Sequence, residues 1–139
     1  EIRLFFFFFL QIVQSADEED RESYKNEKAI KQVFINPTVI SLDGDDWKYN
    51  EGCLSIPKIR EDIYRPESVT LEYVDEQFVP HTATFDGITA RVILHEYDHI
   101  EGKLFIDHIK PITKRLIKSK LENIVKGKVK VDYRMLFVK

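Results

Sequence analysis

Residues 86–102, DGITARVILHEYDHIEG, decide the fold of this chain. Their apolar residues leave almost no polar stripe around a helix, which indicates a helix that is buried on most sides in the middle of a domain. Asp86 suits the N-terminal cap of such a helix, and Gly102 suits its end. We therefore predict a central helix across this stretch.

The same stretch contains His95 and His99 in an H-E-x-x-H pattern. Residues four apart lie on one face of a helix, so both histidines can bind one metal ion. Glu96 then lies where it can reach a water on that metal, which is the acid–base position in metal-dependent hydrolysis. The pattern also arises by chance. A catalytic site of this kind uses three protein ligands, so a third must come from elsewhere in the chain.

The composition is ordinary for one globular domain. The chain has 139 residues, of which 43% are hydrophobic and 32% are charged. Its net charge of −3 gives no case for general nucleic-acid binding. The single cysteine excludes an internal disulfide and fits a reducing cytosol, and no apolar run reaches the ~18 residues of a membrane span. We expect a soluble cytoplasmic protein with neither a membrane nor a DNA partner.

Strands are predicted on both sides of the helix. Residues 2–13 include five consecutive phenylalanines and read as a strand buried on both faces, while the charged residues 15–28 read as a loop or short surface helix. Short strands are expected at 31–35 and 38–42, separated by Asn36-Pro37 and followed by a turn at 43–46. Alternation predicts a strand at 68–73, and its hairpin partner at 77–85 is expected to bend at Pro80.

The C-terminal part is predicted to be helical and basic. Residues 103–109 read as a short strand or extended exit, Pro111 opens an amphipathic helix that ends at Gly127, and 128–138 alternate enough for a final strand. The fold class is thus α+β, with antiparallel strands wrapped around the central helix. From Lys103 onward, 11 Lys and Arg stand against 3 Asp and Glu. This excess fits either a solvated lysine-rich face or a surface that docks on an acidic partner.

Cys53 is the candidate third ligand. A thiolate suits zinc or ferrous iron and leaves one coordination position open, although a single cysteine is more often a small buried hydrophobe. Its neighbours favour the ligand: residues 51–55 are EGCLS, and HEYDH follows about forty residues later. Together these motifs resemble the paired signature of the peptide deformylases. The resemblance runs from about Lys31 through the helix after Pro111.

The resemblance implies a metal-dependent hydrolase that removes the formyl group from the formyl-methionine of nascent polypeptides and releases formate. It implies Cys53, His95 and His99 as ligands of Fe²⁺, with Zn²⁺, Ni²⁺ or Co²⁺ as substitutes. Glu96 would be the general acid and base. The backbone N–H of Leu54 would be a donor to the oxyanion.

Further positions follow from the same resemblance. Asp98 and Arg65 are expected to form an ion pair that holds strand and helix in register. Arg91 is expected at the rim of the pocket for the methionine side chain, because a cation is unusual in an apolar pocket. His81 and His108 lie outside the motifs, and we expect neither to bind metal. The basic helix is expected to contact the ribosome. The positions around the methionine pocket are Tyr49, Glu51, Gly52, Ile88, Arg91 and Val92.

One family motif, G-x-G-x-A-x-x-Q, is not found, since no glycine precedes Gly44. We interpret residues 2–10 as the strand that follows this motif in the family. On this interpretation, residues 1–139 are expected to be a single deformylase-like domain that lacks its N-terminal segment. Losing the glutamine would remove one oxyanion donor, which typically costs about 10²–10³ in rate. The alternatives are a non-catalytic, deformylase-like metal-binding remnant and, less expected, a zinc peptidase.

Overall fold

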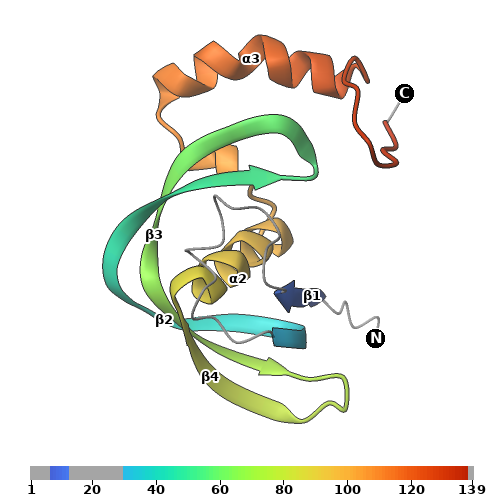
Figure 1. Cartoon of the computed structure of the whole chain (residues 1–139). Helices are drawn as coiled ribbons and strands as arrows, with labels where there is room; N and C mark the ends of the chain where they lie inside the picture. The colour runs from blue at the N-terminus through green and yellow to red at the C-terminus, as the bar shows by residue number, and fades with distance from the viewer. Residues whose placement is uncertain (1–6, 13–29, 138–139) are drawn as a thin grey trace. The chain divides into compact units, whose positions relative to one another are not determined.

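The structure is a computed structural model that describes residues 7–12 and 30–137. It has the predicted α+β fold (Figure 1). The predictions for residues 2–6 and 15–28 lie outside the described residues. The elements, in order, are β1 (Phe7–Ile12), β2 (Ile30–Cys53), β3 (Ile56–Val74), β4 (Pro80–Asp86), α2 (Gly87–Ile100), the 3-10 helix η1 (Phe105–Asp107) and α3 (Pro111–Val125).

The described strands form one sheet in the order β1-β2-β3-β4. β1 pairs antiparallel with the beginning of β2, where Phe7 lies opposite Ile35. β4 pairs antiparallel with the end of β3, where Ser68 lies opposite Asp86. The predicted strand at the phenylalanine run is thus confirmed for Phe7–Ile12, and so is the hairpin of residues 68–86.

Two predicted breaks in β2 are wrong, because the strand runs through both Asn36-Pro37 and residues 43–46. Asn36 and Gly44 have φ angles of +47° and +79°, so each absorbs a local irregularity without ending the strand. A Cβ at Gly44 would lie 2.8 Å from Cβ of Glu67, so glycine also permits the close approach of β3. Pro80 begins β4 instead of bending it, since a residue without an N–H suits the first position of a strand.

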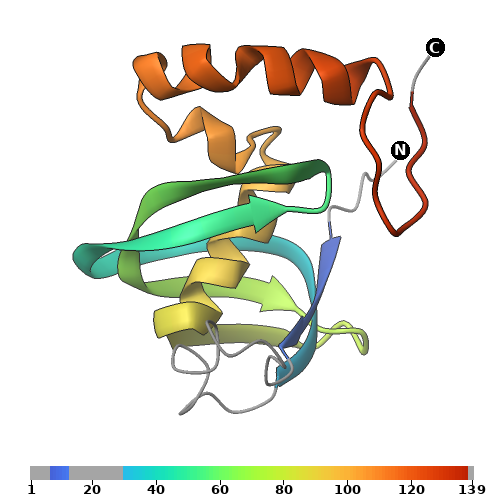
Figure 2. The same cartoon turned by 45° about the horizontal axis from the view of Figure 1, so that its top comes forward.

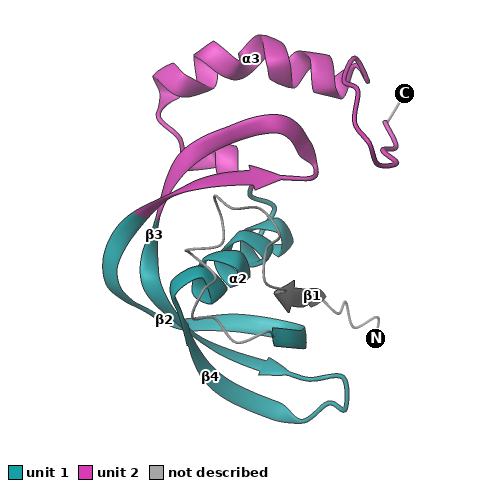
Figure 3. Cartoon of the chain, in the orientation of Figure 1, with its two compact units in different colours: residues 1–47, 65–103 teal, residues 48–64, 104–139 magenta. Residues whose placement is uncertain are grey.

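The chain divides into two compact units, residues 1–47 with 65–103 and residues 48–64 with 104–139 (Figure 3). The core of the first unit joins one face of the sheet to α2. Alternate residues of β3 are buried there, as predicted, and the ring of Phe34 lies 4.5 Å from that of Tyr73. The buried residues of this core are Phe34, Val69, Leu71, Tyr73, Ala90, Ile93 and Leu94.

The prediction of a buried central helix is confirmed, because no residue of α2 is exposed. Asp86 occupies the N-cap position, but its side chain makes no capping hydrogen bond. At the other end Gly102, at φ +73°, donates its N–H to the carbonyl of His99, and Lys103 donates to that of Asp98 (3.1 and 2.8 Å). This pair of bonds is the Schellman ending that a left-handed glycine allows.

The second unit has its own core, in which the first residues of β3 pack against η1 and α3. η1 replaces the strand or extended exit predicted at residues 103–109, because the Asp107 carboxylate accepts the N–H of Leu104 at 3.0 Å and closes a helical turn. α3 begins at Pro111 and is followed by Gly127 at φ +67°, as predicted. The core residues are Ile56, Ile59, Ile63, Phe105, Ile106 and Ile117.

The final strand predicted at residues 128–138 is wrong: residues 128–137 contain neither strand nor helix (Figure 2). Alternation alone cannot make a strand without a neighbour that accepts its backbone hydrogen bonds. In this segment the Tyr133 hydroxyl instead donates a hydrogen bond to the Leu54 carbonyl. Within the described part of the chain, no helix has both the length and the apolar content needed to cross a membrane.

Candidate metal centre

Cys53, His95 and His99 come together in the structure. The Cys53 Sγ and one ring nitrogen of each histidine all lie within 4.8 Å of one another, and all three residues are half-buried. Bonds of about 2.0–2.3 Å to a tetrahedral ion place its ligand atoms roughly 3–4 Å apart, a spacing of the same size as that of this group. A thiolate with two imidazoles is a donor set that fits zinc or ferrous iron. Among the described residues this is the one such group of three or more.

Local structure explains the positions of these ligands. His95 and His99 lie one turn apart on α2, with ring centroids 5.0 Å apart and planes at 85°. Cys53 is the last residue of β2 and precedes a two-residue turn, Leu54-Ser55. Glu96, next to His95, is half-buried on the same helix. Leu54 is 75% exposed, so the turn lies at the protein surface.

A buried ion pair supports the ligand helix. Arg65 Nη1 lies 2.8 Å from Asp98 Oδ2, and their side chains are only 4% and 12% exposed. Removing either partner would leave a charge in a poorly hydrated place, so the pair locks β3 to the turn of α2 that carries His99. The ion pair predicted between Arg65 and Asp98 is therefore present.

The expectation that Arg91 lies at a pocket rim is wrong, because this residue is 2% exposed. Its guanidinium carbon lies 4.2 Å from the ring centroid of Trp47, and its Nη2 donates to the Trp47 carbonyl at 2.6 Å. The π-face and the charge-assisted hydrogen bond stabilise the buried cation. Arg91 therefore joins α2 to β2.

The other expected pocket positions differ in exposure. Glu51 and Ile88 are buried, whereas Tyr49, Gly52 and Val92 are half-buried. A Cβ at Gly52 would lie 3.2 Å from Cγ of Arg60, so the glycine of EGCLS gives Arg60 room to cross the hairpin. The part that these residues play in substrate binding stays a prediction.

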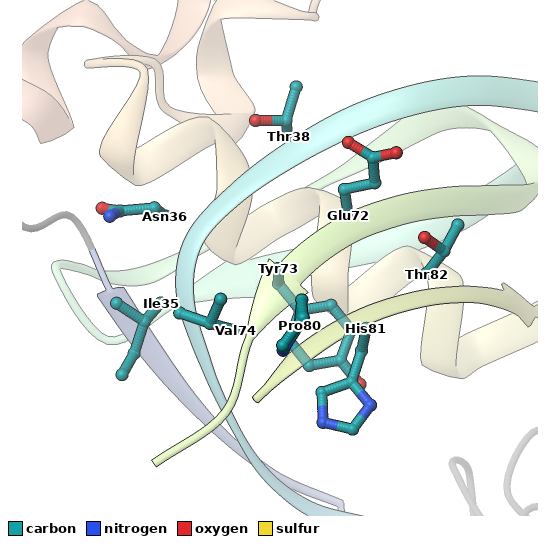
Figure 4. Close-up of a pocket in the computed structure, with 9 residues that line it drawn as sticks. All are labelled: Ile35, Asn36, Thr38, Glu72, Tyr73, Val74, Pro80, His81 and Thr82. Atoms are coloured by element: carbon teal, nitrogen blue, oxygen red, sulfur yellow. The ribbon is translucent and has the colours of Figure 1, made fainter. Parts of the chain in front are cut away.

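Neither His81 nor His108 belongs to the metal-ligand group. The His81 imidazole donates to Asp75 Oδ2 at 2.7 Å and stacks on Tyr73. Together with the N–H groups of Val79 and Gln77, this bond holds the pKa of the Asp75 carboxyl below its ordinary value. His81 also lines a separate open hollow of about 480 Å³ at the edge of β2, β3 and β4, which includes none of the predicted site residues (Figure 4).

The structure shows a polar network beside EGCLS that sequence reasoning missed. Arg60 Nε donates to Asn50 Oδ1 (2.9 Å), Asn50 Nδ2 donates to Asp62 Oδ1 (3.0 Å), and Lys48 lies 3.1 Å from Asp62. The bond from Asn50 and the pairing with Lys48 lower the pKa of Asp62, and the same pairing raises that of Lys48. Polar residues alternate along the chain on both sides of the two-residue turn, and this alternation is the sequence signal that could have predicted the network.

A second missed contact comes from the C-terminal segment. The Tyr133 hydroxyl donates to the carbonyl oxygen of Leu54 at 2.8 Å, across 79 residues of sequence. No local pattern links two residues so far apart, so this contact required the structure.

Comparison with known proteins agrees with this geometry. The sequence model of the family described as polypeptide deformylase matches residues 8–115. The chain is 50% identical over 132 residues to a peptide deformylase of Flavobacterium johnsoniae and 51% identical over 124 residues to one of Christiangramia forsetii. These matches cover 94% and 88% of this chain, but only 67% and 63% of the relatives.

Solved structures are similar as well. The crystal structure of Arabidopsis thaliana peptide deformylase 1B in complex with an inhibitor superposes with a TM-score of 0.68 at 30% identity. That match covers 74% of this chain and 57% of the plant protein. The chain thus spans about two thirds or less of the proteins that it matches.

The ion pair of Arg65 and Asp98 predicts strong energetic coupling. Arg65→Met and Asp98→Asn should each lower the free energy of unfolding by about 3–5 kcal/mol, because each removes the ion-pair partner of a buried charge. The double variant Arg65→Met/Asp98→Asn should lose less than the sum of the single variants. Urea unfolding in the presence of a chelator measures this. Lys118→Met, which breaks an exposed pair with Glu122, is the control and should cost less than about 1 kcal/mol; additive effects at 65 and 98 would contradict the coupling.

The metal-ligand group predicts a thiolate–metal bond. Titration with Co²⁺ should produce sulfur-to-cobalt charge-transfer absorption that Cys53→Ser abolishes. His99→Ala should keep this absorption but weaken binding by more than the ~10–100-fold typical of losing an outer partner of a metal ligand. His81→Ala is the matched control and should bind Co²⁺ normally, since His81 lies outside the group. A Cys53→Ser protein with an unchanged cobalt spectrum would rule out this ligand set.

Proposed function

Because this chain belongs to the peptide deformylase family, we propose that it removes the formyl group from the N-terminal formyl-methionine of nascent polypeptides. The products are formate and the free amino terminus. The observation that carries this proposal is the convergence of Cys53, His95 and His99, with Glu96 beside them on α2. This arrangement offers three candidate ligands, one fewer than a closed tetrahedral site has, and a carboxylate that could act as a base.

The metal in this proposal is Fe²⁺, with Zn²⁺, Ni²⁺ or Co²⁺ as substitutes. When bound, such an ion supplies a Lewis acid and lowers the pKa of water toward neutrality. Cys53 would hold it through a thiolate, and His95 and His99 through neutral imidazoles. Metal analysis of protein isolated without oxygen tests the choice: iron as the main metal supports it, and zinc as the main metal contradicts it.

Glu96 and Leu54 act on the reacting atoms in this proposal. The Glu96 carboxylate takes the proton from the water that attacks the formyl carbon, and returns it to the departing amine nitrogen as the carbon–nitrogen bond breaks. The backbone N–H of Leu54 donates a hydrogen bond to the formyl oxygen as negative charge develops there. Cleavage therefore consumes one water and leaves Glu96 ionised for the next turnover.

Recognition of methionine is proposed to involve positions near these groups. Arg91 takes no direct part in this proposal, because its guanidinium is already stacked on Trp47 and bonded to the Trp47 carbonyl. It supports the helix that carries the neighbouring positions. The residues proposed to contact the methionine side chain are Tyr49, Glu51, Gly52, Ile88 and Val92.

We propose that the protein works in the cytoplasm on chains still attached to the ribosome. α3 carries Lys114, Arg115, Lys118 and Lys120 as exposed cations. Ribosomal RNA is a phosphate surface to which such a basic helix is attracted in a salt-dependent way. This attraction would keep the enzyme close to its substrate.

Co-sedimentation with ribosomes tests the role of α3. Lys118→Glu/Lys120→Glu should weaken binding on the order of tenfold at low salt, because each change replaces an attraction to phosphate with a repulsion. Lys31→Glu/Lys103→Glu makes the same double charge reversal at exposed positions outside α3 and should bind like the unaltered protein. Equal weakening by both variants would show that net charge, and not α3, determines binding.

Glu96→Gln should lower the rate of formate release from a formyl-Met tripeptide by about 10²–10⁴-fold, because the amide cannot accept the proton. The assay uses protein loaded with Ni²⁺, and metal content should be unchanged in the variant. Glu101→Gln, an exposed change just beyond α2, is the control and should keep the rate.

Assays of the unaltered protein distinguish the proposed deformylase from a metal-binding remnant and from a zinc peptidase. Release of formate that Glu96→Gln abolishes supports the deformylase proposal. A folded, metal-loaded protein that releases no formate contradicts it and favours the non-catalytic metal-binding remnant. Cleavage of internal peptide bonds instead of the formyl group would indicate a zinc peptidase.

A further inference from the structure

We propose that Tyr133 is a positioning residue that holds the Leu54-Ser55 turn in place, so that the Leu54 N–H points toward the substrate. The expected effect of Tyr133 on the reaction rests on the proposed deformylase function. Its expected effect on the turn rests only on contacts of the described residues. The key contact is the 2.8 Å hydrogen bond that the Tyr133 hydroxyl donates to the Leu54 carbonyl.

The turn is anchored at both of its ends but exposed between them. Cys53, before the turn, packs against the core of its unit, and Ile56, after it, is a buried member of that core. Leu54 and Ser55 themselves are exposed. Two exposed residues in a turn retain freedom to rotate their peptide planes, so a hydrogen bond at this point removes motion that the core contacts leave.

The Tyr133 bond acts on the residue that carries the proposed oxyanion donor. The Leu54 carbonyl belongs to the peptide that follows its Cα, and the Leu54 N–H belongs to the peptide that precedes it. Cys53 is only half-buried against the core, so its packing alone leaves the preceding peptide some freedom to turn. The Tyr133 bond holds the following peptide, and rotation of the preceding peptide, with its N–H, is then limited from both sides. Donors to an oxyanion gain their effect from being oriented before the reaction.

The C-terminal segment is itself held at its beginning and near its end. Lys128 donates its N–H to the carbonyl of Asn123 (2.7 Å), and Gly127 donates to that of Ile124 (2.9 Å), so the exit from α3 has a defined direction. The Phe137 ring lies so close to Gly127 that a Cβ there would be 3.2 Å from it. The segment therefore folds back on itself, and Tyr133 lies between these two ends in sequence.

Tyr133→Phe removes the hydroxyl and keeps the ring. We expect kcat for formate release by the Ni²⁺-loaded protein to fall about 3- to 10-fold, the range expected for losing one neutral hydrogen bond, while KM changes less than about twofold. Tyr64→Phe removes the hydroxyl of another exposed tyrosine of the same unit and should leave both constants unchanged. Thermal unfolding of the two variants should match that of the unaltered protein.

Amide hydrogen exchange provides a readout that does not depend on activity. Exchange at Leu54 and Ser55 should be faster in Tyr133→Phe than in the unaltered protein or in Tyr64→Phe. Unchanged exchange would overturn the inference even if the unaltered protein released no formate, an outcome that would separately contradict the proposed function. Faster exchange with an unchanged kcat would also overturn it, because the turn would then move without affecting the reaction.

Discussion

The burial of α2, none of whose residues is exposed, is the constraint on which the rest of the structure depends. A helix without an exposed residue has to bring its polar side chains into the protein, and each of them then needs a partner. Asp98 finds Arg65 on β3, and Arg91 finds the ring and carbonyl of Trp47 on β2. The two histidines lie on the same helix, half-buried, and with Cys53 they form a group that could hold a metal ion.

The polar partners of α2 also specify how the helix sits against its sheet. Apolar contacts alone would allow the helix to slide or rotate by small amounts at little cost, because they have no preferred direction. A charge pair and a stacked guanidinium have directions, and the pairs at Asp98 and Arg91 lie on different turns of the helix. Together they restrict both movements within the first unit, and with them the placement of His95 and His99.

The grouping of Cys53, His95 and His99 could be predicted from the sequence because its signals are local. The spacing of His95 and His99 follows from helical geometry, and EGCLS is a short contiguous motif. The strand boundaries were harder: Asn36-Pro37 and Gly44 usually mark turns, but pairing with neighbouring strands kept β2 continuous. The environment of Arg91 and the bond from Tyr133 depend on residues 44 and 79 positions away, for which no periodic pattern exists.

The division of the chain into two units has an evolutionary consequence. Each unit is assembled from two separate segments of sequence, and β2 and β3 each contribute to both units. No single cut in the gene can therefore release one unit intact, and neither can be copied into another protein as a block. Recombination that exchanges one contiguous segment would therefore divide both units. Insertions and extensions are best tolerated at loops and termini, where they interrupt neither unit.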